Sequence, residues 1–375
     1  MYFRERLSKF WTNVQLTLFP YMETRCGELP VEYKNLISIL ELIRVEEFIP
    51  STKFNLGRPC KHRVFIARAY VAKVFLKYPT TKQLIKHLKT DIQLKVICGW
   101  ESYDKIPSES KFSRAFKEFA EENLPEKIHS FLIKETYKDT MVGHLVKDSM
   151  PIEAREKALK KPSVKERKKI KNDRQQAERK GALNRRQKQI KDSLEQSLLE
   201  LPKVCDVGRK RSARGAGYTW KGFKLHMAVD DHCIPISVIL TSASLNDCEA
   251  AIPLAKKANK LVNNFYDVMD AAYDMKEIKE HSLSMGHIPC IDKWVTTTAA
   301  KIERRRDKKK EKILNFCTAE AKRYKIRFPK ERSNALFKDW YGGRNIFYRG
   351  HSKVSCHIMF GVLAMTGLMM IKLIE

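Results

Sequence analysis

Apolar residues recur at spacings of three and four over much of the stretch from residue 31 to 135, which is the period of an amphipathic helix. Proline and polar breaks divide this stretch into short helices. The pattern therefore predicts a helical N-terminal domain over residues 1–140. The residues that carry it include Leu36, Ile37, Leu40, Ile43, Phe65, Ala67, Val71, Val74 and Phe75.

A helix-turn-helix arrangement is predicted within this domain. The segment TTKQLIKHLKTDIQLKVICGW is followed by the break DKIPSES and then by KFSRAFKEFAEEN, where Pro107, Ser108 and Ser110 can start and cap a helix. Two interpretations of that last helix stay open. Its cations at spacings of three suit DNA phosphates or base edges, whereas its phenylalanines suit ordinary packing. The cations are Lys111, Arg114 and Lys117, and the phenylalanines are Phe112, Phe116 and Phe119.

From about Met141 the pattern changes to apolar runs of strand length that alternate with helical segments. HLVKDSM is expected to be a strand that ends at a carboxylate, and KGFKLHMAVD and PISVILTSAS are expected to be neighbouring strands. CEAAIPLAKKANKLV has helical spacing, NFYDVMDAAYDM returns to a strand that ends in acidic residues, and HIPCIDKW is a further strand. This order predicts a mixed α/β domain over residues 141–375.

A basic helical insertion at about 153–200 is expected to separate the first two strands of this domain. Lys, Arg, Glu and Gln dominate it, in runs such as VKERKKIKNDRQQAERK, and aromatic residues are almost absent. It is either a solvated charged arm or a surface that follows the phosphates of duplex DNA.

Net charge then narrows the class of partner. The chain has 73 Lys and Arg against 44 Asp and Glu, a formal charge of +29, which attracts polyanions and most plausibly nucleic acid. A membrane is not expected as a partner, because the longest apolar run, Ile358 to Ile371, is shorter than the roughly 20 residues of a span. The scattered cysteines and the charged N-terminal segment suggest reduced thiols in a cytoplasmic protein.

Two of the predicted strands end in aspartates, Asp148 and Asp270. Phosphodiester exchange uses two divalent cations roughly 3.5–4 Å apart, held by hard oxygen ligands from different elements. Strand ends are rigid places from which carboxylates can converge on such ions. Asp267 and Asp274 lie close enough to Asp270 to compete for this assignment.

A third element supplies another carboxylate with polar neighbours. In RYKIRFPKERSNALFKDW, Tyr324, Arg327, Glu331 and Lys338 fall at intervals of three, four and seven, so a helix would bring them close to one face. Pro329 fits the first turn of a helix better than its interior, so the helix is expected to start near it.

These stretches resemble the DDE transposases of bacterial and archaeal insertion sequences. The resemblance lies in HLVKDSMPI, in the Asp-x-x-Tyr-Asp pattern of YDVMDAAYD, and in the Tyr-x-x-Arg-x-x-x-Glu-(six residues)-Lys signature, whose spacing is matched in full. KGFKLHMAVD, TSASLND and FYRGHSKVSCHI extend the similarity around them, and the segment from KQLIKHLKT to FSRAF looks like the family's amino-terminal domain. Met150, Ala271 and Ala272 depart from the commoner family residues at their positions.

The resemblance implies a ribonuclease-H-like mixed sheet flanked by helices, with Asp148, Asp270 and Glu331 as ligands of two Mg²⁺ ions that Mn²⁺ can replace. By the same resemblance, double-stranded DNA is the partner, as terminal inverted repeats and target, with a homodimer in the synaptic complex of a nucleoid-associated protein. The residues expected to contact DNA are Tyr324, Arg327, Lys338, Lys111, Arg114, Lys117 and Lys224.

Two alternatives stay open from the sequence. A metal-dependent nuclease of the same fold would use the same carboxylates to cut DNA without joining it. A domesticated or inactive transposase would bind DNA through its basic surface and its N-terminal helices, without catalysis.

Overall fold

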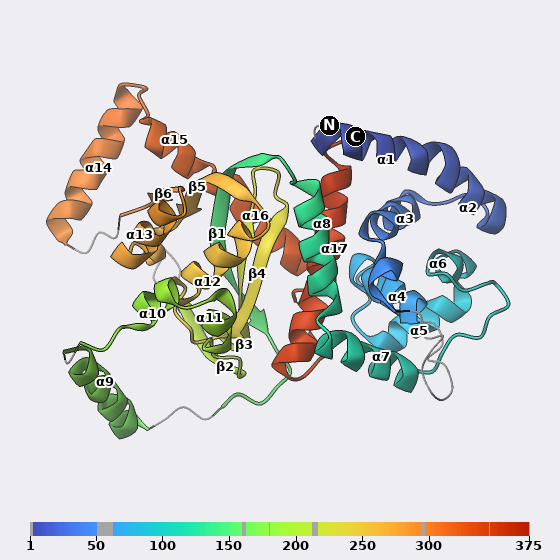
Figure 1. The fold of residues 1–375 in the computed structure, drawn as a ribbon, viewed down its shortest axis with the longest axis horizontal. Helices are drawn as coiled ribbons and strands as arrows, with labels where there is room; N and C mark the ends of the chain where they lie inside the picture. The colour runs from blue at the N-terminus through green and yellow to red at the C-terminus, as the bar shows by residue number, and fades with distance from the viewer. Residues whose placement is uncertain are drawn as a thin grey trace.

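The computed structural model describes the chain in seven stretches: residues 3–50, 63–159, 163–179, 181–211, 217–293, 297–344 and 346–374. Helices from the first third of the chain gather on one side, and a six-stranded sheet lies on the other (Figure 1). The helices α8 (Leu124–Thr136) and α17 (His351–Ile371) stand between the two parts. The protein is therefore mixed α/β with a helical N-terminal region, as the pattern of apolar residues predicts.

The N-terminal region is helical from its first described residues, including residues 3–26, which the apolar spacing did not predict. The apolar residues that mark the later helices, such as Leu36, Ile43 and Val71, are buried in one cluster. In chain order the elements are α1 (Phe3–Asn13), η1 (Val14–Leu18), α2 (Phe19–Cys26), α3 (Val31–Ile43), η2 (Val45–Phe48), α4 (Arg63–Phe75), α5 (Thr81–Thr90), α6 (Ile92–Ile97) and α7 (Glu109–Glu121).

The sheet is built around the long strand β3. Its first half pairs with β2, and its second half lies between β1 and β4, all antiparallel. Beyond β1, the strands β5 and β6 run parallel to it. Gly222 stands where β1 meets the middle of β3, at φ 150°, and a Cβ there would lie 2.1 Å from the carbonyl oxygen of Ile152. The strands are β1 (Met141–Glu153), β2 (Asp206–Arg211), β3 (Gly217–Val229), β4 (Pro235–Ser242), β5 (Asn263–Met269) and β6 (Ile288–Ile291).

Strand β1 corrects one expectation. Asp148 was expected at the end of a strand, but β1 continues for five more residues to Glu153. Its parallel pairing with β5 stops at Val146, whereas its antiparallel pairing with β3 continues from Val146 to Glu153. Asp148 therefore lies where β1 has lost its parallel neighbour and keeps its antiparallel one.

A buried ion pair joins β1 to β5 just before both strands reach their aspartates. Lys147 Nζ lies 2.7 Å from Asp267 Oδ1, and the two side chains are 1% and 0% exposed. Asp267 also accepts hydrogen bonds from Ser282 and Asn264, at 2.8 and 3.1 Å. Because each buried charge needs its partner, this pair fixes how the two strands sit against each other.

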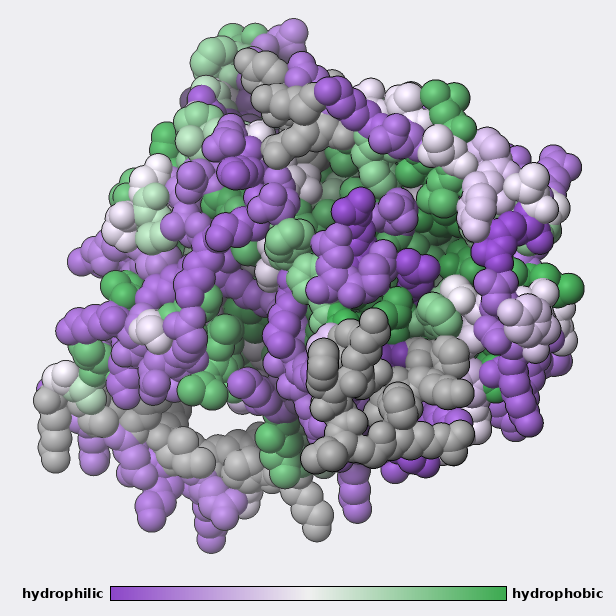
Figure 2. All heavy atoms as spheres, turned by 45° about the vertical axis from the view of Figure 1, so that its right-hand side comes forward, coloured by the Kyte–Doolittle hydropathy of each residue, from purple (hydrophilic) through white to green (hydrophobic). Residues whose placement is uncertain are grey.

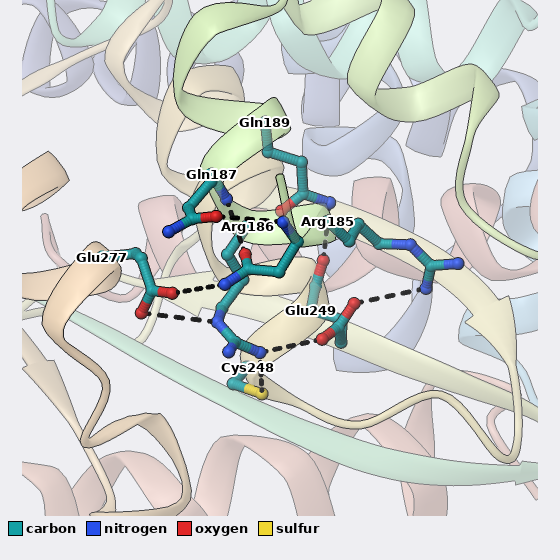
Figure 3. A network of polar contacts seen from close by, with 8 residues as sticks. Arg185, Arg186, Gln187, Gln189, Cys248, Glu249 and Glu277 are labelled. Atoms are coloured by element: carbon teal, nitrogen blue, oxygen red, sulfur yellow. Dashed lines mark hydrogen bonds and ion pairs between the residues drawn. The ribbon is translucent and has the colours of Figure 1, made fainter. Parts of the chain in front are cut away.

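The basic insertion contains three helices, and two of them pack on the domain. Arg186 of α10 bridges Glu249 of α12 and Glu277 of α13, at 2.9 and 3.6 Å, and Gln189 donates to the backbone oxygen of Glu249 (Figure 3). Helix α9 instead projects from the body of the protein (Figure 1). The insertion is thus anchored through its later part. The helices of the insertion are α9 (Val164–Arg179), α10 (Arg185–Lys191) and α11 (Leu194–Leu199). The helices that α10 contacts are α12 (Cys248–Asn259) and α13 (Lys276–Ser284).

The region after β6 is also helical. Helix α14 (Thr298–Ile313) is strongly basic, has no buried residue among those described, and projects beside the sheet (Figure 1). It is followed by α15 (Ala319–Lys325) and α16 (Arg327–Trp340). Pro329 is the third residue of α16, so it falls within the first turn, where proline is tolerated.

The apolar C-terminal helix α17 packs inside the protein, against α3, α4, α7, α8 and β4. With 21 residues, α17 is longer than the apolar run Ile358 to Ile371 suggested, and it is long and apolar enough to cross a membrane. However, 83% of its most apolar stretch is buried inside the protein. A Cβ on Gly361 would lie 2.2 Å from the carbonyl oxygen of Tyr341, so α17 passes close to the end of α16. The helix is therefore mostly buried inside the protein.

Much of the surface is hydrophilic. On the face drawn in Figure 2, hydrophilic residues prevail and hydrophobic residues are scattered between them.

The eight cysteines in the described stretches are free thiols.

Breaking the buried pair is expected to unfold the protein readily. Asp267→Asn or Lys147→Met alone should lower the free energy of unfolding by about 3–5 kcal/mol, because the remaining partner stays buried without its counter-ion. The double variant should lose clearly less than the sum, as urea unfolding will measure. Strict additivity would contradict a direct interaction. The exposed pair Lys276–Glu280 is the control, since a surface pair contributes about 1 kcal/mol at most.

The same pair predicts how stability depends on pH. Burial alone would raise the pKa of Asp267, but Lys147 and His287 hold it well below its ordinary value. The unfolded chain therefore binds the proton more readily, so this contribution is present above about pH 4 and is lost as pH falls further. The stability difference between the wild type and Asp267→Asn should shrink between about pH 4 and pH 2. A constant difference would show that Asp267 does not titrate as a paired group.

Candidate active site

Asp148 and Asp270 occupy matching places on adjacent parallel strands. Val146 of β1 is paired in register with Val268 of β5, and each aspartate follows two residues later along its strand direction. Asp270 comes directly after the end of β5. The sheet thus brings together the two carboxylates that lie 122 positions apart in the sequence.

The carboxylate of Asp148 faces helix α16. Its Oδ2 accepts a hydrogen bond of 2.8 Å from the side-chain amide of Asn334. Burial raises the pKa of Asp148 to about 6, although the charges of Lys210 and Arg327 act in the opposite direction. The charge of Asp270 also raises it, so the two carboxylates repel each other within one site.

The carboxylate of Asp270 is held from two sides. Its Oδ1 accepts a hydrogen bond of 2.9 Å from the backbone N–H of Ala272, which caps the short 3₁₀ helix η4 (Ala271–Tyr273). Its Oδ2 lies 3.6 Å from the Nη2 atom of Arg327, whose side chain is 13% exposed. A buried guanidinium therefore already lies beside the aspartate.

Helix α16 closes the site with residues at helical spacing. Arg327 faces Asp270, Asn334 faces Asp148, and Lys338 follows one turn later. Position 331 lies four residues after Arg327 and three before Asn334, so it shares their face of the helix. The side chain of Glu331 itself lies outside the described residues.

Tyr324 belongs to α15, just before α16. It packs against the small cluster of Val146, Val268 and Cys290, whose two valines lie on the strands that lead to the aspartates. Burial raises the pKa of its hydroxyl, and a hydrogen bond with Arg327 opposes the rise. Of the four signature positions, the structure therefore brings Tyr324 and Arg327 to the two aspartates and places position 331 between them and Lys338.

The two competing aspartates have other partners. Asp267 is fully buried in its pair with Lys147, and Asp274 pairs with Lys279 on α13. Neither carboxylate is free to face α16. This favours Asp270 as the second carboxylate of the site.

A cavity of about 330 Å³ opens between β3 and the turn after β4, and its lining from β1 is Ser149 and Pro151, on the face of the strand opposite to Asp148. Lys224 lines it but already binds Asp247, at 2.9 Å, and the backbone oxygen of Leu245. Burial alone would raise the pKa of Asp247, but the charges of His226 and Lys224 lower it. The predicted DNA contact of Lys224 would therefore compete with an ion pair, and it stays a prediction.

The predicted cations of the N-terminal domain lie on α7. Lys111, Arg114 and Lys117 are exposed, whereas the three phenylalanines of this helix are buried in the core. The packing interpretation is confirmed, and the cations lie on the opposite, exposed face, where Lys117 Nζ is 3.6 Å from Glu121 Oε1. Ser108 is the N-cap residue of α7, but its side chain makes no capping hydrogen bond.

Sequence reasoning missed two neighbours of Asp148, namely Asn334 and Lys210. Asn334 was recognisable from its spacing, because it lies three residues after Glu331 and four before Lys338. Lys210 carried no such signal, because it lies on β2, far in sequence from the signature. Among the described residues, no group of three or more His, Cys, Asp or Glu side chains forms a metal site.

Comparison with known families agrees with this arrangement. Residues 197–366 match the family described as transposase DDE domain, and residues 30–118 match a transposase domain of the DUF772 type. The first match includes Asp270 and Glu331 but begins after β1, so the placement of Asp148 rests on the geometry. No curated protein and no solved structure showed a significant match. Two transposase families, matched in the helical region and in the sheet region, show that the chain belongs to the DDE transposases of the insertion-sequence type.

Proposed function

We propose that this transposase binds the terminal inverted repeats of its insertion sequence and catalyses metal-dependent cleavage and strand transfer of DNA. Asp148, Asp270 and Glu331 are the proposed metal ligands, within a sheet of the ribonuclease-H-like type. The observation that carries the proposal is the convergence of Asp148 and Asp270 on one helix, α16, which also contains Glu331.

The donor set suits a hard divalent cation. The negative charges of Asp148 and Asp270 repel each other, which makes ionisation of both less favourable. A cation bound between them would stabilise both ionised carboxylates. Mg²⁺ prefers oxygen ligands and commonly takes one or two carboxylates from the protein and the rest from water or phosphate. Two such ions would activate the attacking oxygen and stabilise the leaving oxygen.

The chain's own residues would hold the DNA around this centre. Arg327 presents a planar guanidinium beside Asp270, and such a group binds phosphate oxygens in pairs. Asn334 orients the carboxylate of Asp148 through its amide. Lys338, one turn further along α16, would meet a neighbouring phosphate.

Binding to duplex DNA would extend well beyond the active site. The net charge of +29 supports it, as do the exposed cations of α7 and the projecting helix α9, where Lys165, Lys168 and Lys169 are exposed. We keep the proposed division into a DNA-binding domain of residues 1–140 and a catalytic domain of residues 141–375, although α17 packs among the N-terminal helices. The proposed homodimer would form when two transposon ends come together, in the cytoplasm at the nucleoid.

A second candidate is an inactive transposase that only binds DNA. The ion pair between Arg327 and Asp270 favours it, because the guanidinium already neutralises one proposed ligand in the metal-free protein. An active enzyme must move this guanidinium from the carboxylate to a phosphate when metal and DNA bind.

Cleavage of a labelled duplex carrying an end of the element, with Mg²⁺, distinguishes the two candidates. The wild type should cut at the repeat end. Glu331→Gln and Asp270→Asn should each reduce the rate at least about a hundredfold, because a lost ligand removes several kcal/mol of charge stabilisation.

The matched control is Asp274→Asn, which removes a nearby carboxylate that pairs with Lys279 and should leave cleavage intact. Undiminished cleavage by Asp270→Asn would exclude the proposed ligand set. Binding by the wild type without cleavage under Mg²⁺ or Mn²⁺ would favour the inactive protein. Joining of precut ends, tested in the same way, separates a transposase from a nuclease that only cuts.

A further inference from the structure

A second cavity, of about 70 Å³, lies where the N-terminal helices meet the end of α16 and the start of α17. One water needs about 10–15 Å³ of such space, so a phosphate-sized anion fits within it. Its walls come from α4 and the turn after it, from the end of α16, and from α17. The polar lining residues are Lys73, Lys77, Tyr78, Lys338, Asp339, Arg344 and His357.

Lys73, on α4, is the unusual member of this lining. Its side chain is only 1% exposed, and within the described parts of the chain its ammonium has no carboxylate partner. It lies 5.4 Å from the centre of the Tyr348 ring, a contact that compensates only part of the lost hydration. Fully buried lysines are almost always paired, so this one points to a partner from outside the chain.

The rest of the lining is also cationic. Lys77 lies over the ring of Trp340, 3.0 Å from its centre, and Asp339 is already paired with Arg344. His357 is neutral and adds no positive charge, because burial lowers its pKa to about 3; its Nε2 lies 3.1 Å from the backbone oxygen of Gly342. The cavity therefore combines four cations with a single neutralised carboxylate.

The cavity also lies close to the candidate active site along helix α16. Lys338 lies four residues after Asn334, about 6 Å along the helix axis, and Asn334 contacts Asp148. One strand of B-DNA carries a phosphate for about every 3.4 Å of duplex axis, so a phosphate within one or two nucleotides of the active site would reach this place. Lys210 acts electrostatically on both Asp148 and Lys338, which links the two places by a run of positive charge.

We propose that this cavity binds a backbone phosphate of the transposon-end DNA, with the buried Lys73 as its specific donor. The inference rests on the proposed function, because it identifies the substrate's phosphate as the missing counter-ion. Lys73 belongs to the helical region and Lys338 to α16, so one phosphate would hold the two parts of the protein together while DNA is bound.

The test is the salt dependence of DNA binding by the full chain without divalent metal. Anisotropy of a labelled duplex carrying one end of the element gives the affinity over a series of chloride concentrations. Lys73→Met should bind about tenfold more weakly, and the slope of log K against log salt should fall by about 0.9, the loss of one phosphate contact. Lys77→Gln, at the exposed rim, should change both quantities in the same direction.

The matched control is Lys95→Met. Lys95 is another buried lysine of the helical region, 8% exposed, but its Nζ donates to the backbone oxygen of Ser102 at 2.7 Å. Its replacement should leave the salt slope unchanged. Thermal unfolding reports whether each variant folds, and Lys73→Met should be at least as stable as the wild type because an unpaired buried charge is removed.

An unchanged slope in both cavity variants, or an equal loss in Lys95→Met, would overturn the proposal. Inorganic phosphate at constant ionic strength separates the two sources of the anion. If phosphate stabilised the wild type but not Lys73→Met while DNA binding stayed unchanged, the cavity would be a site for a free anion. DNA binding is measured without metal and does not depend on cleavage. A wild type that fails to cleave DNA would therefore refute the proposed chemistry but would not affect the test of the phosphate site.

Discussion

The arrangement of the site depends on one buried ion pair. Lys147 directly precedes Asp148 on β1, and Asp267 lies three residues before Asp270, which follows β5. Both side chains of the pair are buried from water. A slip of either strand by one residue would separate the two charges in an apolar environment, which costs several kcal/mol. A slip would also turn every side chain of the strand to the other face. The pair therefore fixes the register that brings the two aspartates together.

A second constraint comes from α16, which contacts both aspartates once that register has brought them together. The helix meets Asp148 through Asn334 and Asp270 through Arg327, two turns apart. Its far end reaches the cationic cavity beneath α4. One straight element thus connects the carboxylates, the residues proposed to hold the scissile phosphate, and the proposed phosphate site of the helical region. The two carboxylates repel each other, and Lys73 has no carboxylate partner among the described residues, so ligands of opposite charge would stabilise both places.

Much of this was predictable from local patterns. Alternating apolar residues in β3 and β4 and helical spacing in α3, α4 and α7 gave the right elements, because those patterns report which face is buried. Arg327 and Lys338 do lie on one helix, α16, whereas Tyr324 lies on the preceding helix α15. The roles of Asp148, Asp270 and Glu331 as metal ligands stay predictions.

Other features depended on partners distant in sequence. The extension of β1 past Asp148 requires its pairing with β3, some 75 positions away, and the docking of α10 requires Glu249 and Glu277. The pairing of Asp267 with Lys147 and of Lys224 with Asp247 decides which charged groups are free, and no local pattern records it. The cavity around Lys73 joins residues from both ends of the chain, so its existence could not be read from spacing.

The most direct test of the central claim is to locate the metal itself. Anomalous diffraction from crystals of the protein with DNA and Mn²⁺ should show two peaks between Asp148 and Asp270, about 3.5–4 Å apart, with Glu331 as a ligand. The same crystals should show Arg327 moved from Asp270 to a phosphate. Mn²⁺ bound elsewhere, or an intact Arg327–Asp270 pair beside an empty site in the DNA complex, would contradict the account.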